Sequence, residues 1–268
     1  MGRMNNWLPF LPSDPTVAVI RLSGMIGGQA SASLNDVTLA PVIEKAFSKG
    51  KPVAVALAIN SPGGSPVQSA LIAARIRRLA DEKKIPVYAF VEDVAASGGY
   101  WLAVVADEIY ADPSSVVGSI GVISASFGLD KFIANYGVER RVHTAGESKS
   151  MLDPFRPEDP QDVARLEKLL EDIHQNFKDH VTARRGSKLA QDQNLFTGEI
   201  WLGKQAVDLG LIDGIGHLRD VMKQRFGKKV RFREHRAKRG LLSRFGAQMV
   251  QEAVFGIEER ASYARFGL

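Results

Sequence analysis

Short apolar runs alternate along the chain with longer stretches in which apolar residues recur every three or four positions. Runs rich in Val, Ile and Ala predict strands near residues 17–22, 53–59, 86–91, 108–111 and 139–144. The stretch 65–80 follows the second run directly and predicts a helix. Strands that alternate with helical stretches in this way are typical of a layered α/β fold.

A long helix is predicted to begin near Asp159 and to end at Gly186. Asp159 can cap its N-terminus, Pro160 suits its first turn and Gly186 suits its end. Its apolar residues follow the three-and-four spacing of one helix face: Val163, Leu166, Leu170, Ile173, Phe177 and Val181. Such a stripe predicts burial, either in the core or at an interface between subunits.

The candidate chemistry begins at Ser97, which stands in the run Ala-Ser-Gly-Gly-Tyr ahead of another apolar stretch. A serine there can head a helix, with the N–H groups after it, around Gly98, free to meet an oxyanion. Its hydroxyl needs a base, and a lysine serves as one only where desolvation lowers its pKa. Lys149 is the candidate base. Taken singly, such a serine or lysine is more often a loop or surface residue.

A second glycine turn strengthens this interpretation, because Asn-Ser-Pro-Gly-Gly-Ser at 60–65 follows the predicted strand 53–59. A glycine-rich turn between a strand and a helix presents bare N–H groups, so Gly63 and Gly64 can supply another oxyanion donor. A phosphate-binding loop is the competing interpretation, but no Lys-Ser or Lys-Thr pair follows the glycines.

These ordered segments resemble the signal peptide peptidase A type serine proteases of peptidase family S49. The resemblance implies Ser97 as the nucleophile, Lys149 as the general base and the N–H of Gly64 as an oxyanion donor. Gly-Ser-Ile-Gly-Val, which begins at residue 118, is similar to a family turn whose serine supports the lysine, so Ser119 inherits that role. Ser148 departs from the family pattern, which often has an aromatic residue before the lysine.

The likeness extends over residues 17–216 and includes the family's closing segment at 198–214. It implies a ClpP/crotonase-like layered β/α superhelix, or spiral. We therefore expect an N-terminal extension at 1–16, a single peptidase domain at 17–218 and a basic C-terminal extension at 219–268.

The activity that the resemblance implies is hydrolysis of peptide bonds in apolar, extended polypeptides such as signal-peptide remnants. No cofactor or metal is expected. Members of the family assemble into dome-like or ring-like homo-oligomers, and an octamer is the expected assembly for a chain of this length.

Composition agrees with a folded enzyme, since 45% of the 268 residues are hydrophobic and 24% are charged. The chain contains no cysteine, which excludes disulfides and thiolate chemistry. The apolar patch at 1–12 is broken by prolines and is too short to span a membrane. This favours a cytoplasmic protein, in contact at most with a membrane surface.

Positive charge is concentrated after residue 218, with 13 Lys and Arg against 5 Asp and Glu, whereas the preceding residues hold 22 against 25. The basic run at 228–239 and the amphipathic stretch at 241–257 can meet an anionic membrane surface or an acidic partner. The alternative is that this extension packs between subunits. Nucleic acid is not an expected partner, because no nucleic-acid-binding module is present.

Other mechanisms stay open at this point. A histidine base would use His143, beside the lysine segment, whereas His174 and His180 are explained by a solvated helix face. A crotonase-type acyl-CoA enzyme would share the fold and its oxyanion hole. A non-catalytic scaffold would bind partners or a membrane surface through the basic extension.

Overall fold

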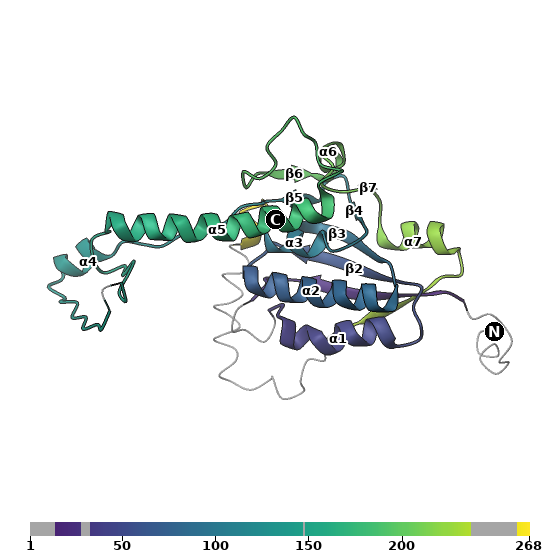
Figure 1. Ribbon diagram of the computed structural model, residues 1–268, viewed down its shortest axis with the longest axis horizontal. Coiled ribbons are helices and arrows are strands. Elements are labelled where there is room, and N and C mark those ends of the chain that lie inside the picture. Colours follow the sequence, from purple (N-terminus) through teal and green to yellow (C-terminus); the bar gives the residue numbers. More distant parts are fainter. Residues whose placement is uncertain (1–13, 28–32, 147, 237–261) are drawn as a thin grey trace.

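The protein is built around one twisted sheet, which a computed structural model describes together with its helices for residues 14–27, 33–146, 148–236 and 262–268 (Figure 1). Within these residues the strand order is β6-β5-β3-β2-β1-β8, with β4 beside β3 and β7 beside β4. All pairs are parallel except β5 with β6. The strands are β1 (Thr16–Ser23), β2 (Ala54–Ser61), β3 (Val87–Ala96), β4 (Glu108–Ala111), β5 (Val116–Gly118), β6 (Ile200–Leu202), β7 (Gly214–Ile215) and β8 (Arg231–His235).

Helices cover both faces of this sheet. They are α1 (Asp36–Ser48), α2 (Pro66–Lys83), α3 (Gly98–Ala103), α4 (Asp130–Asn135), α5 (Pro160–Arg185), α6 (Gly203–Asp208) and α7 (Leu218–Phe226). Buried side chains of α1, α2, α3 and α5 share one core with β1, β2 and β3. Met222 of α7 packs in a second core on the opposite face.

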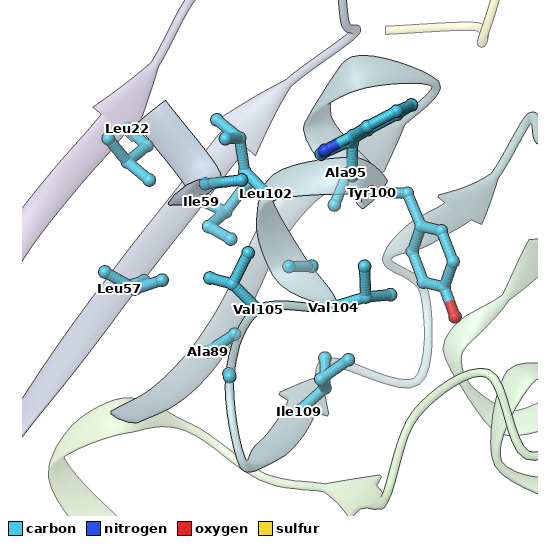
Figure 2. Packing of buried hydrophobic residues seen from close by; sticks show 14 of the residues in the cluster. Leu22, Leu57, Ile59, Ala89, Ala95, Tyr100, Leu102, Val104, Val105 and Ile109 are labelled. Carbon is cyan, nitrogen blue, oxygen red and sulfur yellow. The ribbon is translucent and has the colours of Figure 1, made fainter. Parts of the chain in front are cut away.

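Successive side chains of the central strands point to opposite faces of the sheet, which explains the two cores. Leu57 and Ile59 of β2 face α3, while Ala56 and Ala58 face the second core. Figure 2 shows the first core, in which Leu102 of α3 lies beside Ile59. Tyr100 points to the other side, where its hydroxyl donates to the carbonyl of Leu211 at 2.7 Å. Because both faces are covered, the strands read in the sequence as nearly continuous apolar runs.

Four of the five predicted strands are confirmed as β1, β2, β3 and β4, and the helix predicted at 65–80 is α2. The strand predicted at 139–144 is wrong. Those residues form no regular element and are exposed apart from the half-buried Val142. They lie in a part of the chain that is remote from the sheet, so their backbone has no neighbouring strand to pair with.

The long helix is confirmed as α5, with its ends where the sequence places them. Asp159 accepts a hydrogen bond from the N–H of Gln161 at 2.8 Å, and Gly186 follows the last turn. Of the apolar stripe only Phe177 and Val181 are buried. The N-terminal half of α5 and the residues before it, 121–173, extend away from the sheet (Figure 1), and we call them the arm.

The start of the basic C-terminal segment belongs to the folded body. Helix α7 contributes Met222 to the second core, and β8 pairs with β1 in parallel from Arg231 to His235. A domain boundary at residue 219 stays a prediction. The amphipathic stretch expected at 241–257 and most of the expected N-terminal extension lie outside the described residues. Within the described part of the chain, no helix combines the length and the apolar character needed to cross a membrane.

A buried ion pair fastens the C-terminal end of α5 to the body. Arg185, whose side chain is 3% exposed, donates to Asp213 at 2.8 Å and to the carbonyl of Gly210. Burial alone would raise the pKa of Asp213, but hydrogen bonds from Arg185, Lys188 and the N–H of Ile109 hold it below its usual value. The carboxylate therefore stays charged and joins α5 to β4.

We expect Asp213→Ala to lower the free energy of unfolding by about 3–5 kcal/mol, because it leaves the Arg185 charge buried without its partner. Urea unfolding followed by circular dichroism measures this change. The matched control is Glu82→Ala, which removes an exposed pair with Arg78 and should cost at most about 1 kcal/mol. Equal losses in the two variants would contradict the role given to the buried pair.

Candidate active site

Ser97 occupies a strained turn between β3 and α3. Its φ of 52° and ψ of −121° place a non-glycine residue where side chains are rarely found. Its N–H donates to the carbonyl of Gly118 at 2.9 Å, and its own carbonyl accepts from the N–H of Trp101 at 3.0 Å. The side chain makes no capping bond to the helix and is half-buried. The backbone is thus held from both sides while the hydroxyl stays available.

The Gly63–Gly64 turn lies directly against Ser97. Both glycines have a positive φ, and a Cβ on Gly63 would lie 2.8 Å from the Cβ of Ser97. A Cβ on Gly64 would lie 2.0 Å from the carbonyl oxygen of Ile26. Such distances leave no room for a side chain, so glycine is required here by both conformation and space.

Neighbouring backbone and side-chain groups brace this glycine turn. The N–H of Ile26 donates to the carbonyl of Gly63 at 2.8 Å, and the N–H of Ser65 donates to the carbonyl of Ile26 at 2.7 Å. Ser61 is fully buried, and its hydroxyl donates to the carbonyl of Gly24 and accepts from the N–H of Gly63 at 3.3 Å. The two backbone hydrogen bonds with Ile26 use the carbonyl of Gly63 and the N–H of Ser65. The N–H of Gly64, which lies between them, takes no part in these bonds.

The N–H groups of Gly64 and Gly98 lie close together beside Ser97. A Cβ built on Gly98 would be 3.4 Å from the nitrogen of Gly64. Gly98 is the first residue of α3, so its N–H has no partner within the helix. Two N–H groups at a helix start next to a serine hydroxyl can stabilise the oxyanion of an acyl-transfer intermediate.

Ser119 lies on a third turn at the same edge of the sheet. Gly118 pairs with Ala96 in the β5–β3 register, so Ser119 follows β5 as Ser97 follows β3. Ser119 also has a positive φ of 52°, and its N–H donates to the carbonyl of Glu199. The fold therefore gathers four of the five predicted site residues, Ser97, Gly64, Gly98 and Ser119, from three turns.

Lys149 lies elsewhere. It is exposed, in a turn of the arm where its N–H donates to the carbonyl of Gly146 at 3.2 Å. His143 is also exposed in the arm. In Figure 1 the arm, with α4, reaches well beyond the sheet and α3. Within one chain the structure does not bring Lys149 to Ser97.

The solvated helix face expected for His174 and His180 is wrong, because both lie half-buried where α5 meets the site. Nε2 of His174 is 3.1 Å from the carbonyl of Ile120, beside the Ser119 turn. His180 stacks on Trp101 with ring centroids 4.6 Å apart, and its Nε2 is 3.1 Å from the Trp101 carbonyl. Their spacing, on the helix face that carries Phe177, was the signal available in the sequence.

The family model for peptidase family S49 matches residues 79–230, more than half of the chain. The chain therefore belongs to peptidase family S49. Over its whole length it is 45% identical to a Brucella abortus protein named Na(+)/H(+) antiporter NhaA. Over 75% of the chain it is 34% identical to the chloroplastic serine protease SPPA of Arabidopsis thaliana. Over 89% of the chain it is 30% identical to the probable protease SohB of Haemophilus influenzae.

The resemblance to signal peptide peptidase A type proteases is thus confirmed at the level of the family. The chain covers 39% of the Brucella protein, 31% of the Arabidopsis protein and 66% of the Haemophilus protein. It spans well under half the length of the first two of these relatives. What their names describe belongs to those longer proteins.

His180 makes the contact between α5 and α3 sensitive to pH. Burial lowers its pKa and the nearby charge of Arg184 lowers it further, although the hydrogen bond with Trp101 opposes both. A histidine whose pKa is lower in the folded state stabilises the fold fully above its unfolded value of about 6.5 and loses that contribution as the pH falls.

We therefore expect the melting temperature of the wild type to fall between about pH 7.5 and about pH 5, and to fall less in His180→Gln. Differential scanning calorimetry of both proteins at the two pH values measures this. His235, whose pKa is also lowered by burial and by nearby cations, is present in both proteins and cancels in the comparison. Identical pH dependence would contradict the role of His180.

Proposed function

We propose that the protein is a serine peptidase that hydrolyses peptide bonds with a Ser-Lys dyad. The observation that carries the proposal is the position of Ser97, strained in a turn, beside the N–H groups of Gly64 and Gly98. Membership of peptidase family S49 supports the same conclusion.

The reaction follows from the chemistry of these groups. Neutral Lys149 accepts the Ser97 hydroxyl proton as the oxygen attacks the scissile carbonyl, and the N–H groups of Gly64 and Gly98 stabilise the oxyanion. The protonated lysine then gives its proton to the leaving amine. The same lysine then deprotonates a water molecule, which attacks the acyl ester. As the bond to the Ser97 oxygen breaks, the lysine returns the proton to that oxygen and the acyl group leaves as a carboxylic acid. Ser119 is proposed to hold the lysine ammonium.

This scheme needs Lys149 to come from a second copy of the chain, because the arm carries it away from Ser97 (Figure 1). No described residue between Ile120 and Phe177 is buried. The arm exposes Ile123, Phe127, Phe132, Tyr136 and Val138, each more than half accessible. An apolar surface of this extent is typical of an interface.

Assembly would change the chemistry of the lysine as well as its position. An exposed lysine is protonated at neutral pH and cannot act as a base. Docking the arm on a neighbouring copy would take the Lys149 amine out of water, and desolvation is the condition under which a lysine can act as a base. We propose a homo-oligomer in which each arm completes a neighbour's site, with eight copies as the expected number.

The proposed substrates are apolar, extended polypeptides such as signal-peptide remnants, which is what the resemblance to the signal peptide peptidase A type proteases implies. A relative named as a serine protease supports peptide-bond hydrolysis. The proposed fold is the ClpP/crotonase-like spiral with a C-terminal extension. The parallel strands and the helices that join them are consistent with it.

We expect Ser97→Ala and Lys149→Ala each to abolish cleavage of an unstructured protein and of apolar fluorogenic peptides, without loss of fold. Lys131→Ala is the matched control, because Lys131 is another exposed lysine of the arm, and it should keep wild-type activity. Cleavage by the Lys149→Ala variant would contradict the role of Lys149 as the general base. If the wild type also cleaves neither substrate, the result would favour a non-catalytic scaffold or an acyl-CoA enzyme.

Mixing the two inactive variants tests whether the dyad forms between copies. A mixture of unfolded Ser97→Ala and Lys149→Ala chains, refolded together in equal amounts, should recover roughly a quarter of wild-type activity, because a quarter of neighbouring pairs then combine an intact serine with an intact lysine. If the dyad forms within one chain, every site lacks one member and the mixture stays inactive.

A further inference from the structure

The last described residues of the chain, 262–268, lie against the edge of the sheet that carries the candidate site. Tyr263 and Phe266 pack on Val94, Ala96 and Val116, a cluster separate from the two larger cores. Val94 and Ala96 point to the face of β3 opposite Ala95, and Ala96 directly precedes Ser97. The contact therefore lies beside the nucleophile, on the face of the sheet away from α3.

Two polar contacts extend this packing to the other turns of the site. The Tyr263 hydroxyl donates to the carbonyl of Asn60 at 2.7 Å, three residues before the Gly63–Gly64 turn. The Ser262 hydroxyl lies 3.6 Å from the sulfur of Met25, next to the residue whose backbone braces that turn. The segment thus touches β2, β3 and β5, the three strands that the site turns follow.

We propose that Met25, Asn60, Val94, Ala96 and Val116 form a peptide-docking surface beside Ser97, and that its occupant is the segment 262–268. While the segment is docked, it restricts the approach of large molecules to Ser97. The statement that this restriction also limits proteolysis rests on the proposed function. The docking of the segment is independent of the proposed function.

The local structure of the segment explains why this occupant fits. The N–H groups of Phe266 and Leu268 both donate to the carbonyl of Tyr263, at 2.9 and 3.3 Å. This tight turn sets Tyr263 and Phe266, three residues apart, on one side of the segment. Arg265, between them, is exposed. The surface therefore holds two aromatic rings that are three residues apart in a helical turn.

The same turn distinguishes the docked segment from a substrate. Peptides that bind along a sheet edge offer an extended backbone whose N–H and carbonyl groups are free to pair. In this segment the Tyr263 carbonyl and two of the following N–H groups are already paired with one another. The segment occupies the surface next to Ser97 without presenting an extended peptide bond to it.

The absence of cysteine from the natural sequence allows a test that does not depend on peptidase activity. Ser97→Cys places a single thiol at the site, and the rate of its alkylation by a maleimide joined to a polyethylene glycol chain reports the access of a large molecule. Full-length proteins carrying this change are compared with and without substitutions in the segment. Iodoacetamide, a small reagent, reports the intrinsic reactivity of the same thiol.

With the bulky maleimide, Tyr263→Ala combined with Phe266→Ala should speed alkylation at least about tenfold, since it removes both aromatic contacts. Tyr263→Phe keeps the ring and loses one hydrogen bond, so the expected gain is about two- to tenfold. Arg265→Ala, the matched control in the same segment, should leave the rate unchanged. Iodoacetamide should respond much less to any of these changes.

Equal maleimide rates in the double variant and in the Arg265→Ala control would overturn the proposal, as would an equal acceleration with both reagents. The peptidase assay on chains with Ser97 intact separates the two proposals. If the rates follow the expected order but the wild type cleaves nothing, the docking surface stands and the proposed function fails. If the wild type cleaves and the rates do not differ, the docking surface fails and the proposed function stands.

Discussion

The arrangement of the site depends on how closely two backbone turns approach each other at one edge of the sheet. Because β2 and β3 run parallel and adjacent, both end at this edge, and the residues that follow them meet. A Cβ on Gly63 would lie 2.8 Å from the Cβ of Ser97. Only bare backbone fits between them, so the N–H groups of Gly64 and Gly98 converge beside the serine. Ser97 has its positive φ at this point of close approach, and the hydrogen bond from its N–H to the carbonyl of Gly118 holds the turn.

Helix α5 links this edge to the arm. Its buried half stacks Phe177 and His180 on Trp101, one turn into the helix that begins after Ser97. Its other half carries the arm outward by about 1.5 Å per residue. The direction in which Lys149 is presented is therefore set by packing on the helix of the nucleophile. A neighbouring copy that accepts the arm would receive the lysine in an orientation that this contact defines.

The two apolar surfaces near the site have different occupants in our interpretation. The side chains of the arm are exposed in a single chain, which fits an assembly of several copies. The surface around Val94, Ala96 and Val116 is already covered by Tyr263 and Phe266 of the same chain. One surface would complete the site when copies associate. The other would restrict access to it until the segment leaves.

Local patterns in the sequence were sufficient for most of the fold. Apolar runs predicted four strands, and Asp159, Pro160 and Gly186 predicted both ends of α5, because strand burial, capping and proline geometry act within a few residues. The glycine turns and Ser97 were also recognisable, since bare N–H groups need glycine and a helix start. The strand predicted at 139–144 failed because pairing depends on a neighbour that the arm does not provide.

Only the tertiary structure decided what depends on contacts between distant residues. It placed β8 beside β1, His180 on Trp101 and Tyr263 on Asn60. In the first and the last of these contacts the partners are more than 200 residues apart in the sequence. It also separated Lys149 from Ser97 within one chain. The sequence by itself determined which residues can carry the chemistry, because residue type and local turns set nucleophilicity and backbone freedom. Whether these residues come close together depends on long-range packing, which no local sequence pattern encodes.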